Sequence, residues 1–267
     1  MSIINVDVVS PQSGDNVEVN GLKITGSVNI GLGNDNTTAS TTSGEGNIGV
    51  GNDTLATVST GYNNIGIGYN SLNSQSSGSA NVGIGASTLS LSTGNWNVAV
   101  GNTAGEIIST GAKNVLLGDS AGDSLTTGDN NIIIGWVADA STATVSNSIT
   151  LGNSYHNVLR CAVTSITSLS DARDKTNIEE STYGLDFIDS LKPVKFEWDT
   201  RDGAKKGVKD LGFIAQDLKE VDDEYLGLVY SENPEKLEAS YGRLIPVLVK
   251  AIQELSAKVE ILEAKKK

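Results

Sequence analysis

The stretch Asn64-Ile-Gly-Ile-Gly68 decides the fold, because the first half of the chain repeats its pattern at a nearly constant interval. Successive closing glycines are 17, 17, 16, 17 and 17 residues apart, and the pattern extends back to Asn29 and forward to Gly152. A fixed period is the signature of a solenoid, in which each repeat forms one turn. The other full copies are Asn47-Ile-Gly-Val-Gly51, Asn81-Val-Gly-Ile-Gly85, Asn97-Val-Ala-Val-Gly101, Asn114-Val-Leu-Leu-Gly118 and Asn131-Ile-Ile-Ile-Gly135.

Each repeat predicts one turn of a parallel β-solenoid, with turns of 16–18 residues. A short β-branched strand leads into a glycine corner, a shorter second strand and a second corner where Ser or Thr precedes glycine. Glycine supplies corner conformations that a side chain forbids. Asn at one position of every turn is expected to stack into a ladder, each amide bonding its copies above and below. The second glycine column comprises Gly44, Gly61, Gly78, Gly94, Gly111 and Gly128.

A single turn buries only a few aliphatic side chains, which is too little to order it alone. Even the whole stack is thin, so we expect burial against neighbouring chains and predict a mainly β solenoid over residues 26–152, whose trimeric state is implied by the resemblance given below. Residues 1–25 are interpreted as an N-terminal cap or attachment segment. Residues 153–169 are interpreted as a neck or linker, in which His156 and Cys161 are interpreted as packing or neck residues; a role as ligand or nucleophile is the alternative.

The distribution of charge divides the 267 residues into two regions. Residues 1–169 hold 3 basic and 11 acidic side chains, and residues 170–267 hold 16 and 21, which gives the totals of 19 and 32. The net charge of −13 argues against a nucleic-acid partner or an anionic membrane surface. No apolar run reaches the ~18 residues of a membrane span. Asp7 interrupts the N-terminal residues before the apolar stretch of a secretory signal peptide could form, so no such signal is expected. One His and one Cys exclude an internal disulfide and a zinc site of several such ligands.

The second region carries an ordered set of motifs. It opens with Ser170-Asp-Ala-Arg-Asp-Lys175 and continues with Gly184-Leu-Asp-Phe-Ile-Asp-Ser-Leu-Lys-Pro-Val194, Phe196-Glu-Trp198, Gly212-Phe-Ile-Ala-Gln-Asp217 and Tyr241-Gly-Arg-Leu-Ile-Pro-Val. In order and spacing these motifs resemble the C-terminal intramolecular chaperone auto-processing domain of endosialidase tailspikes and many phage fibres. The resemblance implies a domain over residues 170–267 that drives trimer folding and then cuts itself off.

The same resemblance implies an autocatalytic serine endopeptidase with a Ser-Lys dyad. Ser170 is then the nucleophile, Lys175 its base, and the bond between Leu169 and Ser170 the one that is cut. Burial of the lysine on trimer closure would favour its neutral form and couple cleavage to assembly. The motif residues Asp171, Arg173 and Asn177 are interpreted as support for the turn. No cofactor and no metal are implied.

The glycine repeats resemble the β-roll heads of trimeric autotransporter adhesins and repeats in phage tail fibres, over about residues 29–152. A plain structural spacer is the simplest interpretation of such repeats. A calcium-binding repeat is a poor match to the period of 17 and the scarcity of Asp. Ser and Thr before the second glycines are interpreted as solvated corners; a flat, ice-binding hydroxyl array is the alternative.

An α+β domain ending in a long helix is expected after residue 170. We expect helices over 183–190 and 215–221, strands over 194–198 and 207–214, and a coiled-coil helix over about 242–264. β-Branched residues at position a with Leu at d would favour two strands, whereas the family resemblance implies a trimer, which we adopt. The seam consists of Ile245, Leu248, Ile252, Leu255, Val259 and Leu262.

The favoured hypothesis is a phage tail fibre or tailspike subunit for host attachment, assembled in the host cytoplasm into the virion, with the chaperone fragment released after cleavage. Its partners would be two further copies, other virion tail proteins and, as a candidate, a host cell-surface glycan or protein. The alternatives are a bacterial surface adhesin or fibre with the same chaperone, and a structural shaft with an inactive peptidase. No glycan-degrading activity is expected, because residues 1–169 hold no large catalytic domain.

Overall fold

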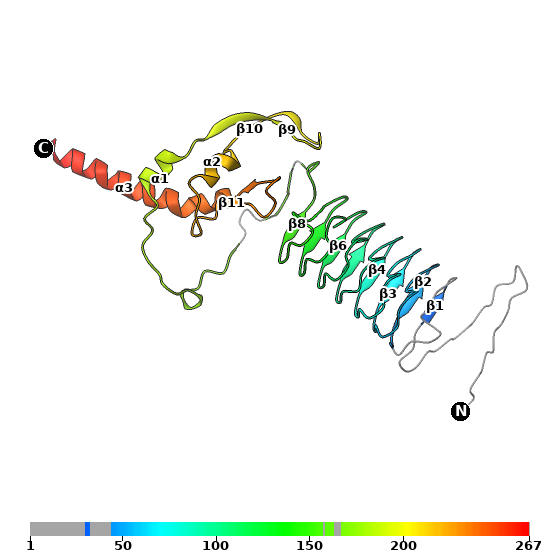
Figure 1. The fold of residues 1–267 in the computed structure, drawn as a ribbon. Coiled ribbons are helices and arrows are strands. Elements are labelled where there is room, and N and C mark those ends of the chain that lie inside the picture. Colours follow the sequence, from blue (N-terminus) through cyan, green and yellow to red (C-terminus); the bar gives the residue numbers. More distant parts are fainter. Residues whose placement is uncertain (1–29, 33–43, 157, 163–166, 267) are drawn as a thin grey trace, which may run out of the picture.

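The computed structural model describes residues 30–32, 44–156, 158–162 and 167–266. Its first region is a solenoid of eight parallel strands stacked in sequence order (Figure 1). The predicted fold class, a parallel β-solenoid followed by an α+β region with a long C-terminal helix, is confirmed. Residues 1–25 and Asn29 lie outside the described residues. The strands are β1 (Ile30–Leu32), β2 (Ile48–Val50), β3 (Ile65–Ile67), β4 (Val82–Ile84), β5 (Val98–Val100), β6 (Val115–Leu117), β7 (Ile132–Ile134) and β8 (Ile149–Leu151).

The strands pair with no shift in register, so equivalent positions of the repeat lie directly above one another. Gly66 of β3 pairs with Gly83 of β4, and the flanking Ile67 pairs with Ile84. The single 16-residue turn keeps this alignment, because Ile84 pairs in turn with Val100 of β5. The repeat period in the sequence therefore translates directly into columns of like side chains along the solenoid.

The predicted Asn ladder is present from Asn47 to Asn131, except that at the 16-residue turn the backbone N–H of Asn97, and not its amide group, donates to Oδ1 of Asn81 at 2.9 Å. The Nδ2 group of Asn64 donates to Oδ1 of Asn47 at 3.0 Å and to the carbonyl of Gly78 at 2.8 Å. Oδ1 of Asn47 also accepts from the backbone N–H of Asn64 at 3.0 Å. These side chains are fully buried, and their hydrogen bonds offset the cost of removing an amide from water.

The prediction of a second strand in each turn is wrong in the described residues, where this side consists of turns. The backbone is left-handed at Asp53 (φ 56°) and Leu55 (φ 52°), and again at Asn70 and Leu72 one turn later. An extended strand cannot include such residues. The turns still bond their neighbours, because Leu72 N donates to the carbonyl of Thr88 at 2.9 Å.

The two columns require glycine for different physical reasons. Gly68, at the end of a strand, has a φ of +127°, a conformation that L side chains rarely adopt. Gly61, in the second column, is not left-handed, but a Cβ there would lie 2.3 Å from the carbonyl oxygen of Gly78. The second column is therefore glycine because adjacent turns approach closely, and not because of its backbone angles.

The interior of the solenoid keeps its volume while its residues change. In the early turns the strand centres are glycine, as at Gly66, and a leucine such as Leu55 fills the core from the opposite side. Later the strand centre is large, as at Leu116, and the opposite side is small, as at Gly105. A Cβ on Gly105 would lie 2.5 Å from Cδ1 of Leu116. Only one of the two sides, the strand centre or the turn opposite it, can therefore carry a large side chain.

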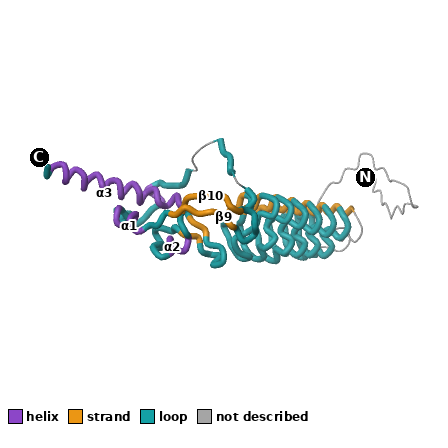
Figure 2. Tube along the Cα trace, turned by 90° about the horizontal axis from the view of Figure 1, so that it is seen from above, coloured by secondary structure: helices purple, strands orange, loops and turns teal. Residues whose placement is uncertain are grey.

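The second region begins with the 3-10 helix η2 (Ala172–Asp174). The core of this region consists of Leu218, Leu226, Leu228, Leu244 and Val247. Its last helix, α3 (Leu244–Ala264), leads away from the solenoid to the C-terminus (Figure 2). The predicted helices and strands are present, with ends moved by a few residues. They are α1 (Leu185–Ser190), β9 (Val194–Asp199), β10 (Lys206–Gly212), α2 (Ala215–Lys219) and α3 (Leu244–Ala264). The structure adds elements that were not predicted, β11 (Val229–Tyr230), β12 (Glu238–Ala239) and η3 (Tyr241–Arg243).

The C-terminal region contacts the end of the solenoid through polar groups. Nδ2 of Asn233 donates to the carbonyl of Ser141 at 2.8 Å, and the Ser154 hydroxyl donates to Asp202. The hydrogen bond from Ser154, together with those from the Ala204 N–H and Thr200, lowers the pKa of Asp202 to about 2. No helix in the described part of the chain is long and apolar enough to cross a membrane.

Candidate functional site

The segment between the two regions places a serine and a lysine in direct contact. Lys175 Nζ lies 2.8 Å from Ser170 Oγ and 3.3 Å from the backbone oxygen of the same residue. The intervening residues form η2, a tight turn that is closed by the Lys175 N–H donating to the carbonyl of Ala172. This turn reverses the chain over five residues and brings the lysine back over the serine.

Asp171 and Arg173 hold the turn in two ways. Asp171 is the N-cap residue of η2, and its Oδ1 accepts from the backbone N–H of Arg173 at 2.9 Å. The Arg173 guanidinium also binds this carboxylate through both oxygens, with Nε–Oδ1 at 3.0 Å and Nη2–Oδ2 at 2.6 Å. The pKa of Asp171 is lowered by this pairing and that of Arg173 is raised. The paired residues thus stabilise a turn whose two ends are Ser170 and Lys175.

The surroundings of this turn are open to solvent. Leu169 is 95% exposed, so the peptide bond that joins it to Ser170 is accessible. Ser170 and Lys175 are exposed as well. Asn177 follows in a left-handed conformation (φ 53°), which Asn tolerates better than most residues.

The contact between hydroxyl and amine defines what the site can do chemically. A neutral lysine amine at this distance can take the proton of a serine hydroxyl and so generate an alkoxide nucleophile. Water favours the charged ammonium, whereas an apolar cover favours the neutral amine. The exposed arrangement around Lys175 therefore has the required distance but needs a cover to act as a base.

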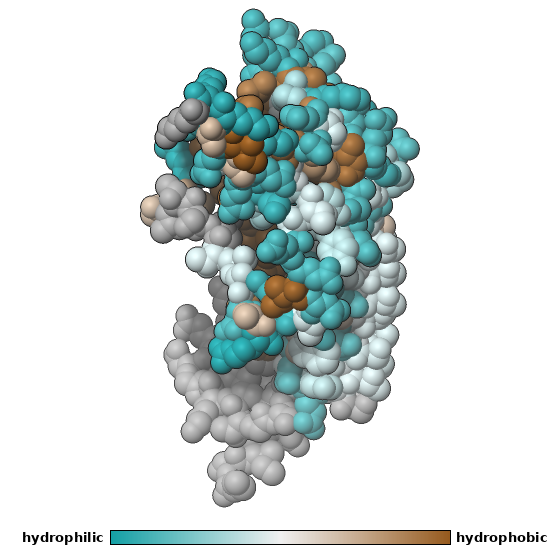
Figure 3. Space-filling model, turned by 90° about the vertical axis from the view of Figure 1, so that its left-hand side faces the viewer, coloured by the Kyte–Doolittle hydropathy of each residue, from teal (hydrophilic) through white to brown (hydrophobic). Residues whose placement is uncertain are grey.

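The residues of the expected seam lie on one face of α3 and are exposed. On an adjoining face Leu244, Val247 and Ala251 are buried. Val249, absent from the predicted seam, is also exposed and lies beside it, whereas the exposed Ile261 lies on another side of the helix. Figure 3 shows hydrophobic residues at the surface of the C-terminal region among hydrophilic ones. The exposed fractions of the seam are Ile245 63%, Leu248 44%, Ile252 65%, Leu255 50%, Val259 45% and Leu262 59%.

The lone histidine and cysteine lie apart from any cluster of ligands. The His156 ring contacts Gly152, and its Nδ1 is 3.0 Å from Oδ1 of Asn153. Cys161 is exposed and unpaired. No group of three or more His, Cys, Asp or Glu side chains that could hold a metal ion occurs among the described residues.

Several of the hydroxyl groups before the second glycines bond the neighbouring turn of the solenoid. Thr93 Oγ1 donates to the carbonyl of Ser109 at 3.0 Å, and Thr126 Oγ1 donates to that of Ala143 at the same distance. Because these hydroxyls bond the next turn, they are not presented as a free array. This geometry favours the interpretation as corners over an ice-binding face.

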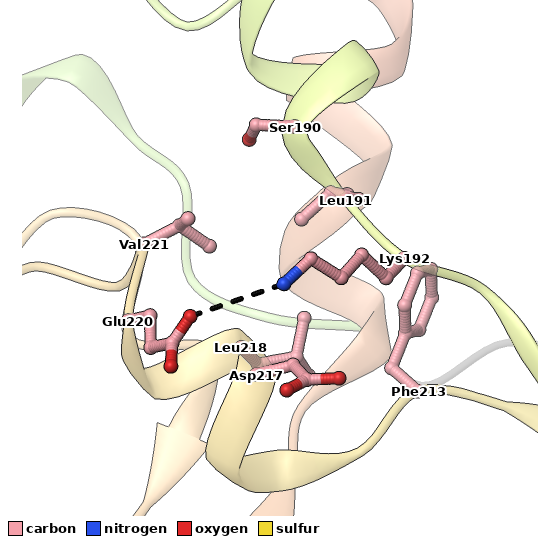
Figure 4. A pocket seen from close by; sticks show the side chains of 8 residues that line it. All are labelled: Ser190, Leu191, Lys192, Phe213, Asp217, Leu218, Glu220 and Val221. Carbon is pink, nitrogen blue, oxygen red and sulfur yellow. Dashed lines mark ion pairs between the residues drawn. The ribbon is translucent and has the colours of Figure 1, made fainter.

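A pocket lies between the end of α1 and α2 (Figure 4). Its volume is about 20 Å³, room for roughly one water molecule. Lys192 and Glu220 meet across it, with Nζ and Oε2 at 4.0 Å. This pocket is too small for an organic substrate.

Comparison with known families assigns part of the second region. Residues 170–227 match the family model described as the chaperone of endosialidase, a peptidase family. The match begins at Ser170 and includes Lys175, whereas α3 lies beyond its end. No curated protein and no solved structure matches the chain.

Proposed function

We propose that this chain is a subunit of a homotrimeric fibre whose C-terminal region chaperones assembly and then cuts itself off between Leu169 and Ser170. The observation that carries the proposal is the 2.8 Å contact between Lys175 Nζ and Ser170 Oγ. It lies at the start of the segment that matches the chaperone of endosialidase. The long solenoid ahead of this segment is a fibre-like element for such a chaperone to assemble.

In the proposed reaction the neutral Lys175 amine takes the proton of the Ser170 hydroxyl. The oxygen attacks the carbonyl carbon of Leu169, and the C–N bond breaks as the lysine returns the proton to the departing amine. Leu169 is now joined to Ser170 Oγ by an ester. Water hydrolyses that ester, which leaves a Leu169 carboxylate and restores the serine hydroxyl. Two fragments of 169 and 98 residues result, since 169+98=267.

Assembly supplies the cover that the dyad lacks in one chain. The apolar seam of α3 is exposed, and burying it against two other copies brings three C-terminal regions together. A neighbouring chain over Lys175 would exclude water and favour the neutral amine. Cleavage then follows assembly and does not precede it.

For the biological context we retain the phage tail fibre or tailspike, matured in the host and displayed on the virion for attachment. The family description, which names an endosialidase chaperone, supports this choice. A bacterial surface fibre with the same chaperone is the alternative. The exposure of Lys175 in the single chain favours one further candidate, a structural shaft whose peptidase is inactive.

Intact-mass spectrometry of the purified chain tests the proposed chemistry. Wild type should convert to the two fragments, while Ser170→Ala, Lys175→Ala and Lys175→Arg should remain whole and still form trimers. Arginine fails because its guanidinium does not deprotonate near neutral pH. Cleavage of Ser170→Ala at the wild-type rate would show another nucleophile or a contaminating protease. A whole wild-type chain in a well-formed trimer would identify the inactive shaft.

A further inference from the structure

The strands of the solenoid lie together along one side of it (Figure 2, orange), and their outward residues are aliphatic. In β2–β7 the central residue is buried and its two neighbours are half-buried or exposed, as in β4, where Gly83 is buried and Ile84 is exposed. In β8 the central Thr150 is half-buried and both neighbours are exposed. We call the outward pairs of β2–β8 the aliphatic face. Its members are Ile48, Val50, Ile65, Ile67, Val82, Ile84, Val98, Val100, Val115, Leu117, Ile132, Ile134, Ile149 and Leu151.

The aliphatic face differs from the rest of the solenoid in its charge. All of its members are Ile, Val or Leu, whereas charged side chains lie in the turns between strands, such as Glu106, Lys113 and Asp119. Contiguous apolar patches of this kind are uncommon on monomeric proteins and mark interaction sites. The solvent-exposed fractions of Ile84, Val100 and Ile134 are 37%, 37% and 38%, so the face is a surface and not part of the core.

The size of the face fits a stable protein interface. With adjacent strands about 4.8 Å apart, β2–β8 extend it over roughly 29 Å. If each of its side chains exposes about 50 Å², the apolar area is roughly 700 Å² per chain, close to the ~800 Å² per partner of a standard interface. Burial of this area would supply a large part of the hydrophobic stabilisation that the thin solenoid needs.

We propose that the aliphatic face packs against the same face of two other copies of this chain, around a common axis. The inference deepens the homotrimer proposed above and rests on it. A second copy is the partner that fits, because its side chains repeat at the same strand spacing and can interdigitate along the whole length. The charge of the face is compatible with this partner. Chains of net charge −13 repel one another, but the face itself is uncharged, so no like charges meet when two copies pack through it.

The stability of the trimer tests this assignment. Ile84→Lys or Val100→Lys places three ammonium groups in the interface, whereas the control Leu91→Lys alters an aliphatic residue outside the face that is 54% exposed. The face variants should lose detergent-resistant trimers or dissociate at least about 10 °C lower than wild type, and the control should not. Equal resistance of all three variants and wild type would overturn the proposal.

Cross-linking gives a second test that adds no charge. In a Cys161→Ala background, Val100→Cys should be joined between chains by a short bis-maleimide, and Leu91→Cys should not. Equal cross-linking of the two cysteines would place the interface elsewhere while leaving the trimer intact. A monomeric wild type would instead overturn the homotrimer itself, so the two failures are distinguishable.

Discussion

The Ser170 hydroxyl and the Lys175 amine meet at the two ends of a turn that contains Asp171 and Arg173. Asp171 caps η2 and binds Arg173 through both carboxylate oxygens. If these contacts set the turn, their loss should displace the amine from the hydroxyl. A displacement of about 1 Å is enough to slow a reaction by roughly 10²-fold.

Asp171→Ala should therefore slow self-cleavage by about 10- to 100-fold, because it removes both the cap and the ion pair. Asp171→Asn keeps an oxygen for the Arg173 N–H and should recover part of the rate. Asp174→Asn removes the same charge from the same turn and is the matched control. The rate of fragment formation, followed by intact mass in samples of equal trimer content, decides the matter. A wild-type rate for Asp171→Ala would show that the turn does not position the dyad.

Gly68 is expected to tolerate no side chain. It has a φ of +127°, and a Cβ there would lie 2.4 Å from the carbonyl oxygen of Gly85. Gly68→Ala should lower the stability of the solenoid by about 1–3 kcal/mol or more, since both strain and a steric clash result.

Gly242→Ala is the control for this change, because nothing lies within 4 Å of a Cβ at Gly242. Thermal unfolding measured by far-UV circular dichroism compares the two variants with wild type. An unfolding midpoint of Gly68→Ala equal to that of wild type would contradict the described corner.

At the scale of elements, α3 has one face buried in its own chain and another exposed. Ile252 and Leu255 lie at the centre of the exposed seam. Ile252→Asp combined with Leu255→Asp would put six charges into a closed trimer and should leave monomers or aggregates. Gln253→Asp combined with Ala257→Asp adds the same charges away from the seam and should assemble normally. Light scattering after size-exclusion chromatography gives the mass; soluble trimers of the seam variant at normal yield would show that the seam is dispensable.

The regular features could be predicted from the sequence because they depend on period. The repeat of about 17 residues gave the strand positions and the Asn ladder, and the 3,4 spacing of Ile and Leu gave the exposed face of α3. The contact of Lys175 with Ser170 was expected only from a family resemblance, since a five-residue spacing alone does not bring two side chains together.

The second side of each turn could not be predicted in this way. Leu55 and Leu72 are good helix or strand formers, yet both are left-handed here. Their conformation is imposed by stacking, because each leucine must fill the core opposite a strand-centre glycine while its backbone bonds the next turn. A propensity describes one residue, and this constraint arises between turns.

At the scale of the whole molecule, two apolar surfaces lie on either side of the proposed cleavage site. The aliphatic face belongs to the solenoid and the seam of α3 to the C-terminal region, with Leu169 and Ser170 between them. Such an arrangement allows the chaperone to start assembly through α3 and the solenoid to retain it afterwards. After cleavage the 169-residue fragment should therefore remain trimeric.

Refolding followed over time shows whether cleavage comes after assembly. The denatured chain is refolded, monomer and trimer fractions are separated by size at successive times, and the intact mass of each fraction is recorded. We expect fragments of 169 and 98 residues to arise in the trimer fraction of wild type, with monomers whole throughout. Cleaved chains appearing in the monomer fraction as early and as abundantly as in the trimer fraction would contradict this order.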